Sequence, residues 1–69
     1  MKLSARNRLT GTVTSINRGE AIANVVIEVG GQRIVSSITV EAVDELGLKE
    51  GSTATAIIKA SDVMVATDM

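Results

Sequence analysis

The amino-acid sequence predicts an all-β fold, a small barrel of five short strands with one short helix between the third and fourth strands. Val, Ile and Thr, whose branched side chains suit a pleated strand, make up about a third of the 69 residues. Short apolar runs are separated by tight turn signals that contain glycine. The chain has no proline, and one stretch shows the apolar spacing of a helix.

The first two expected strands cover residues 8–17 and 21–29. In the first, apolar and threonine side chains alternate, and Gly11 interrupts the pattern in a way that indicates a bulge or a tight bend. The second is apolar on one face and half apolar on the other, so both faces are expected to be buried. In so small a protein, the second face is most easily buried by another subunit.

The pair Gly30-Gly31 predicts a two-residue hairpin, because both central residues of a type I′ turn need a positive φ. It leads into a third strand over residues 32–40. Thr39 can cap a helix of one or two turns, which ends at Gly47. A fourth strand over residues 52–60 and a short last strand over 63–66 complete the expected elements.

Five short strands with a helix between the third and fourth are typical of the Greek-key barrel called the OB-fold. A simple five-stranded meander is the main alternative. The barrel is favoured because closure removes exposed strand edges, which such an aliphatic sequence could not leave uncovered.

Residues 1–69 are expected to form one domain, because a chain of this length holds no more than one. So small a domain usually needs a disulfide, a structural metal or oligomerisation for stability. The sequence has no cysteine and no histidine, which excludes disulfides and argues against a zinc site. Since 45% of the residues are hydrophobic, more than one small core requires, we expect a homo-oligomer that covers the spare apolar surface.

The same composition argues against catalysis. Histidine, the most common general base, is absent, and no phosphate-binding loop or Ser-Lys motif is present. The acidic residues of segment 41–45 are most simply a solvated face of the short helix. We therefore expect no enzymatic activity, no cofactor and no directly coordinated metal cation.

A net charge of −1 and the absence of aromatic residues argue against nucleic-acid binding by an OB barrel. No apolar run approaches the roughly 18 residues of a membrane span, and the N-terminus lacks the apolar core of a secretory signal. We expect a cytoplasmic protein with neither nucleic-acid nor membrane partners.

Two segments are rich in hydrogen-bond donors: Ser4-Ala5-Arg6-Asn7 and Ile58-Lys59-Ala60-Ser61. A tetrahedral dianion offers only acceptor oxygens, so its site is built from N–H, hydroxyl, ammonium and guanidinium groups. Each segment also has a simpler explanation: a solvated basic N-terminus in the first, and an edge lysine with a turn serine in the second. Composition alone leaves both explanations open.

The opening Ser4-Ala5-Arg6-Asn7, followed by Leu9-x-Gly11-x-Val13, resembles the opening of the molbindins. So do the stretches Glu45-Leu46-Gly47-Leu48-x-x-Gly51 and Ala56-Ile57-Ile58-Lys59-Ala60-Ser61-Asp62-Val63-Met64. Molbindins are small cytoplasmic molybdate-binding proteins, and their module also occurs in molybdate-responsive regulators and, as the transport-associated OB domain, in transporter ATPase subunits. The resemblance covers residues 1–66.

This resemblance implies an OB-like five-stranded barrel that assembles as a hexamer, a trimer of dimers. It also implies that molybdate or tungstate is held by hydrogen bonds between subunits, and that the two donor segments are halves of one site that meet across an interface. Asn7 matches the family motif, which leaves open a structural role or a ligand contact, and Arg8, which stands where glutamine is common, is not assigned to the ligand. The positions that match the binding elements of the family are Ser4, Ala5, Arg6, Thr39, Lys59, Ala60 and Ser61.

The leading hypothesis is therefore a non-enzymatic protein that binds molybdate or tungstate for intracellular storage or homeostasis. The alternative hypothesis is an OB-like oligomerisation or interaction module without significant oxyanion binding.

Overall fold

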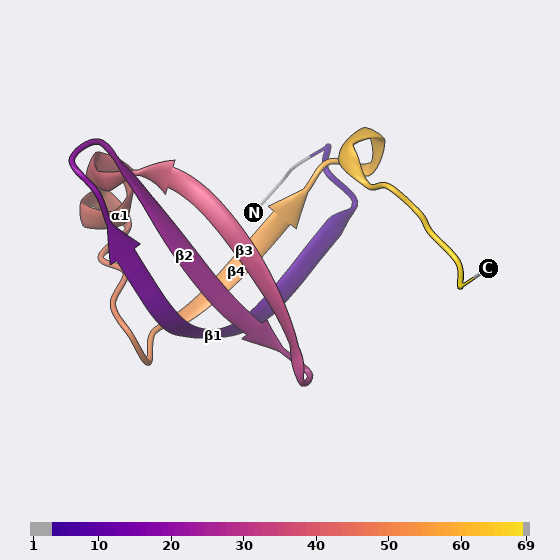
Figure 1. Cartoon of the computed structure of the whole chain (residues 1–69), viewed down its shortest axis with the longest axis horizontal. Coiled ribbons are helices and arrows are strands. Elements are labelled where there is room, and N and C mark those ends of the chain that lie inside the picture. Colours follow the sequence, from indigo (N-terminus) through magenta and orange to yellow (C-terminus); the bar gives the residue numbers. More distant parts are fainter. Residues whose placement is uncertain (1–3, 69) are drawn as a thin grey trace.

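One long strand, β1 (Asn7–Arg18), bends along its length and pairs with two other strands (Figure 1). The computed structural model describes residues 4–68. Its sheet is antiparallel with the strand order β3-β2-β1-β4, in which the fourth strand lies beside the first as in a Greek key. The other elements are β2 (Ile22–Val29), β3 (Gln32–Thr39), helix α1 (Val40–Leu46), β4 (Thr53–Ile58) and the 3₁₀ turn η1 (Ala60–Asp62).

The sequence predicted a bulge or a tight bend at Gly11, and the irregularity of β1 lies two residues further along the strand. The first half of β1 pairs with β4 up to Thr12, and the second half pairs with β2, with a break in register between Val13 and Ser15. At Gly11 the backbone of β2 passes so close that a Cβ atom would overlap the carbonyl oxygen of Glu28. Only glycine lets one strand serve both neighbours at this point.

The local turn signals also form as predicted. Gly30 and Gly31 both have positive φ, 55° and 81°, in the hairpin between β2 and β3. Thr39 caps α1, since its Oγ1 accepts a 3.0 Å hydrogen bond from the Ala42 amide. Gly47 follows α1 in the left-handed conformation. The amides of Gly47 and Leu48 donate hydrogen bonds to the helix carbonyls of Asp44 and Val43.

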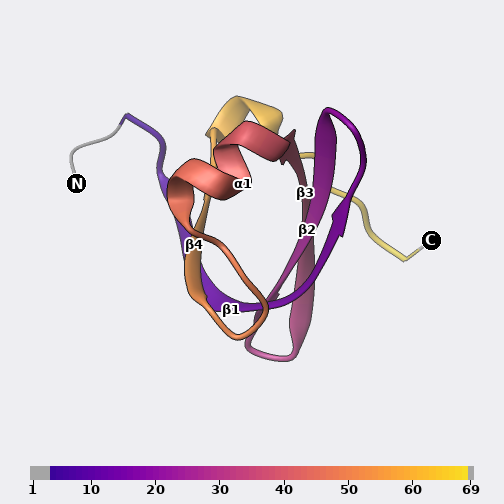
Figure 2. The same ribbon diagram turned by 90° about the vertical axis from the view of Figure 1, so that its left-hand side faces the viewer.

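The buried core lies inside the curl of the sheet, below α1. Figure 2 shows the sheet curving from β4 through β1 to β2 and β3, with α1 across one end. Helix α1 packs against β2 and β3 and contributes one fully buried side chain to this core. The buried residues are Val13, Ala23, Val25, Ile27 and Val43. One face of β2 thus points inward as predicted, whereas the other face, which was also expected to be buried, is largely exposed in the single chain, with Ile22 at 50%.

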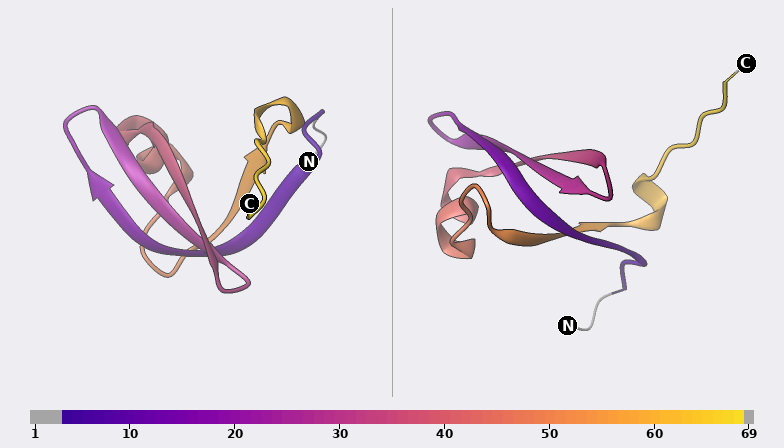
Figure 3. Two further views of the ribbon diagram at one scale, coloured as in Figure 1. Left: turned by 45° about the vertical axis from the view of Figure 1, so that its right-hand side comes forward. Right: turned by 90° about the horizontal axis from the view of Figure 1, so that it is seen from below.

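Two parts of the predicted fold are wrong. Residues 63–66 form no strand, and the barrel is only half closed, because the outer edges of β3 and β4 do not pair. The cause is that η1 turns the chain away from both free edges, so the segment after it runs outward without a partner (Figures 1 and 3). Met64 is 94% exposed and Val65 is 88% exposed.

The strand ends differ slightly from prediction. β1 is one residue longer at each end, and Val40 opens α1 rather than ending β3. The fourth strand is shorter than predicted, since Ala60 already belongs to η1.

The close approach of the strands at Gly11 yields a stability prediction. Gly11→Ala would place a methyl group against the β2 backbone and 2.8 Å from Cγ2 of Val29, so we expect it to cost at least about 1–3 kcal/mol. Gly30→Asn is the control, because its site is open and asparagine tolerates a positive φ. Urea unfolding should show a much larger loss for Gly11→Ala; equal stability of the two variants would contradict this account of Gly11.

Candidate functional site

The two donor-rich segments leave the sheet at the same end. Asn7 pairs with Ile58, which joins the first residue of β1 to the last residue of β4 in an antiparallel register. The segment before Asn7 and the segment after Ile58 therefore start from neighbouring positions at this end of the ladder, and they diverge beyond it (Figure 2 and the right view of Figure 3). Figure 1 and the left view of Figure 3 show the start of β1 close to η1. One chain thus starts both segments at the same end of its sheet, whereas the family resemblance implies that they meet across an interface.

This end of the sheet carries positive charge that no described residue neutralises. Arg6 precedes Asn7 and Lys59 follows Ile58, so each is the first residue beyond the last ladder pair. Both side chains are exposed. Within residues 4–68, the one salt bridge joins Arg18 to Asp44 at the opposite end, with 3.0 Å between Nη2 and Oδ1. The guanidinium of Arg6 and the ammonium of Lys59 are therefore available to an external anion.

Ala5 and Ala60 have no polar side-chain atoms, so each can serve an anion only through its backbone amide. In η1, the amides of Asp62 and Val63 donate to the carbonyls of Lys59 and Ala60, at 2.9 and 3.2 Å. Within residues 4–68, the amides of Ala60 and Ser61 make no such turn bond. Together with the hydroxyls of Ser4 and Ser61, these amides add uncharged donors to the two cations.

Thr39 lies at the other end of the sheet. It pairs with Ile22 beside α1, whereas Asn7 and Ile58 end the sheet on the far side (Figure 1). Its Oγ1 accepts the capping bond from Ala42, which leaves the hydroxyl proton free to donate. Thr39 cannot share a small ligand with Arg6 of the same chain, so the structure does not bring all the predicted site residues together.

Sequence reasoning left the role of Asn7 open and could not identify its partner. Asn7 Nδ2 donates a 3.2 Å hydrogen bond to the carbonyl of Ile58, at the point where the two donor segments begin. The asparagine was visible in the opening motif, but its partner depends on the register between strands 51 positions apart, which no local pattern reveals.

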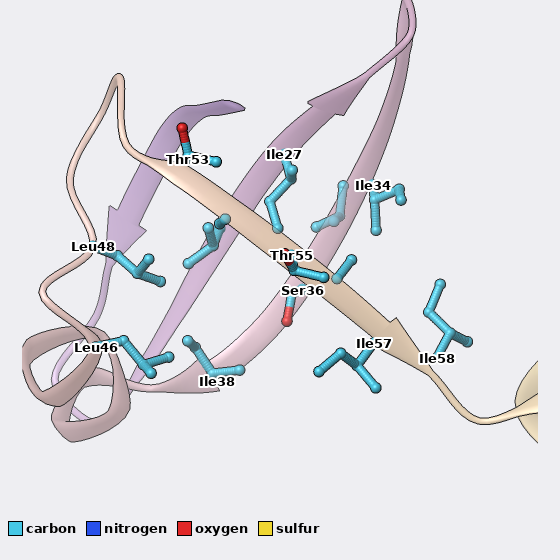
Figure 4. Close-up of a pocket in the computed structure, with 14 residues that line it drawn as sticks. Ile27, Ile34, Ser36, Ile38, Leu46, Leu48, Thr53, Thr55, Ile57 and Ile58 are labelled. Atoms are coloured by element: carbon cyan, nitrogen blue, oxygen red, sulfur yellow. The ribbon is translucent and has the colours of Figure 1, made fainter. Parts of the chain in front are cut away.

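An apolar groove of about 590 Å³ opens between β4 and the β2–β3 pair (Figure 4). Figure 4 shows Ile27, Ile34, Ile38, Leu46 and Leu48 around it, with Ser36, Thr53 and Thr55 as its labelled polar residues. No charged side chain lines it, so it does not suit a dianion. It is the uncovered interior of the half-closed barrel.

Among the described residues, no helix is long and apolar enough to cross a membrane. Residues 4–68 also contain no cluster of three or more metal-ligating side chains.

The chain is similar over most of its length to proteins with molybdenum-related names. The "Probable molybdenum-pterin-binding protein" of Haemophilus influenzae is 49% identical over 69 residues, which cover 99% of this chain and all of that protein. The solved structure of MopII from Clostridium pasteurianum matches with a TM-score of 0.89 and 45% identity, covering 96% of this chain and all of that one.

A molybdate-bound structure of the cytoplasmic molybdate-binding protein ModG matches with a TM-score of 0.90 and 54% identity. That alignment covers 93% of this chain but 46% of ModG. The TOBE domain model matches residues 3–65, which include the donor segments, α1 and all four strands. The chain therefore belongs to the TOBE domain family, and its relatives include the molybdenum-pterin-binding proteins.

Proposed function

We propose that this chain, as a single molbindin-like domain over residues 1–69, binds molybdate or tungstate without catalysing a reaction. The observation that carries the proposal is the donor-rich end of the β1–β4 pair, where Arg6 and Lys59 have no carboxylate partner within residues 4–68. The names of the relatives favour molybdate as the ligand, and ModG is described as cytoplasmic. Storage or homeostasis of the oxyanion in the cytoplasm fits a binder without catalytic groups.

The donor set matches the chemistry of a tetrahedral dianion. Two cations oppose its two negative charges, while hydroxyl and amide donors saturate the remaining lone pairs on its four oxygens. Asp62, in η1, is the carboxylate nearest in sequence to this end, and its side chain must point away from a bound anion. Ser4, Ala5, Arg6, Lys59, Ala60 and Ser61 are the proposed ligands from one chain.

We further propose that the site is completed in a homo-oligomer, a hexamer built as a trimer of dimers. Thr39 can reach the donor end only from another copy, because it lies at the opposite end of its own sheet. The apolar groove and the exposed apolar segment Val63–Val65 leave aliphatic surface in contact with water in a monomer, which is unfavourable in free energy. A ligand that binds only the assembled form stabilises it by mass action.

The groove also favours a second candidate function, an oligomerisation or interaction module without significant oxyanion binding. It is apolar and lacks the charge that would recognise an anion, so it could serve assembly alone. The two candidates differ in whether the cations at the donor end matter.

Titration of the assembled protein with molybdate, tungstate, sulfate and phosphate separates the two candidates. Arg6→Ala and Lys59→Ala should each weaken molybdate binding by about 2–5 kcal/mol, the cost of removing one partner of a buried charge pair. That corresponds to a loss of affinity of about 30-fold or more. Lys49→Ala is the matched control, since it removes the same charge from the exposed turn before β4.

Lys49→Ala should bind molybdate like the unmodified protein. Selectivity over sulfate is expected to follow the size of the site, because both dianions present four oxygens. Absence of molybdate binding by assembled protein below about millimolar, or equal affinity in all three variants, would favour the second candidate.

Thr39 has two separable roles that substitution distinguishes. Thr39→Asp keeps an acceptor for the Ala42 amide but removes the hydroxyl proton and adds a negative charge, so stability should change by less than about 1 kcal/mol while molybdate affinity falls sharply. Thr39→Ser keeps the cap and the donor, and should retain both stability and binding. Thermal unfolding and titration measure the two effects. Unchanged affinity in Thr39→Asp would remove Thr39 from the site.

A further inference from the structure

Asn7, the last residue of the first donor segment, forms the side-chain hydrogen bond nearest the end of the β1–β4 pair. Its Nδ2 donates to the carbonyl of Ile58 at 3.2 Å, and the residue is half-buried. The pair Asn7–Ile58 is also the outermost pair of this ladder. Beyond this pair, the next residue at the end of β1 is Arg6 and the next residue at the end of β4 is Lys59. These are the two cations of the proposed site.

The like charges of Arg6 and Lys59, at the ends of adjacent strands, repel each other. This repulsion favours separation of β1 and β4 at the end of the ladder. A hydrogen bond immediately inside the two cations opposes this splaying at the position where it has most effect. Arg6 and Lys59 therefore need a restraint when no anion lies between them, and Asn7 supplies one.

The bond also orients the peptide unit between Ile58 and Lys59. The carbonyl that Asn7 binds and the amide N–H of Lys59 belong to the same peptide unit, between Ile58 and Lys59. That unit is planar and trans, so its C=O and N–H point in opposite directions. Fixing the Ile58 oxygen toward β1 therefore points the Lys59 amide away from β1 and fixes the direction in which the chain enters η1.

We propose that Asn7 is a positioning residue for the oxyanion site: it holds the peptide between Ile58 and Lys59 and keeps the two strand ends that carry Arg6 and Lys59 together. The inference rests on the proposed function. Asn7 itself need not touch the ligand, which agrees with its side-chain amide being engaged with Ile58.

Asn7→Leu tests this role, because leucine has a similar volume but cannot donate. Thr10→Val is the matched control: it removes the other side-chain hydrogen bond between the same two strands, the 2.9 Å contact of Thr10 Oγ1 with Thr55 Oγ1, away from the cations. Asn7→Gln keeps an amide donor on a longer side chain. All three are compared as assembled protein with the unmodified chain.

We expect Asn7→Leu to weaken molybdate binding tenfold or more and to reduce the ratio of molybdate to sulfate affinity several-fold. Thr10→Val should stay within about twofold on both measures, and Asn7→Gln should recover part of the loss. The ratio matters because mere destabilisation lowers the apparent affinity for both anions alike. An unchanged affinity and ratio in Asn7→Leu, while the unmodified protein binds molybdate, would overturn the inference.

Hydrogen exchange of the ligand-free protein provides a readout that does not depend on binding. In Asn7→Leu, exchange should accelerate in the last residues of β4 and in η1, and the β2–β3 hairpin should stay unchanged. Equal exchange in Asn7→Leu and the unmodified chain would also overturn the inference. Failure of the unmodified protein to bind molybdate would instead refute the proposed function.

Discussion

The fold depends on the ability of β1 to pair with β4 along its first half and with β2 along its second. That double pairing requires the close approach of the strands at Gly11, where the β2 backbone leaves no room for a side chain, and the bulge between Val13 and Ser15, where β1 bends. The bend curls the sheet around the core and sets the register in which Asn7 faces Ile58. The position of the donor end at the end of the ladder is thus a consequence of packing some distance away, close to Val13.

The charges at the two ends of the molecule are handled differently. Near α1, Arg18 and Asp44 pair at the surface, an interaction worth at most about 1 kcal/mol. At the donor end, Arg6 and Lys59 stay unpaired within the described residues, so the chain carries an electrostatic cost that an anion would relieve. The apolar groove carries a second cost that another copy would relieve. If one assembly both places an anion beside the two cations and covers the apolar groove, ligand binding and oligomerisation stabilise each other.

Sequence reasoning succeeded where the deciding chemistry is local. The glycine pair of the hairpin, the Thr39 cap and the alternation along β2 each follow from neighbouring residues, and each forms as predicted. It failed where the outcome depends on a distant partner. The apolar pattern of residues 63–66 predicts a strand, but a strand needs a free edge within reach, and η1 directs the chain away from both edges. The Asn7–Ile58 bond was invisible for the same reason. The two donor segments were visible as runs of hydrogen-bond donors, whereas Thr39 and the joining of the segments into one candidate site came from family resemblance.

The central claim is that the donor end becomes an oxyanion site only when copies of the chain assemble. Native mass spectrometry with increasing molybdate tests it most directly, because one spectrum reports the number of chains and the number of bound anions. The account predicts that molybdate appears on oligomers alone and that the oligomer fraction grows as molybdate is added. Monomers that carry molybdate, or a stable oligomer that carries none at about millimolar molybdate, would contradict it.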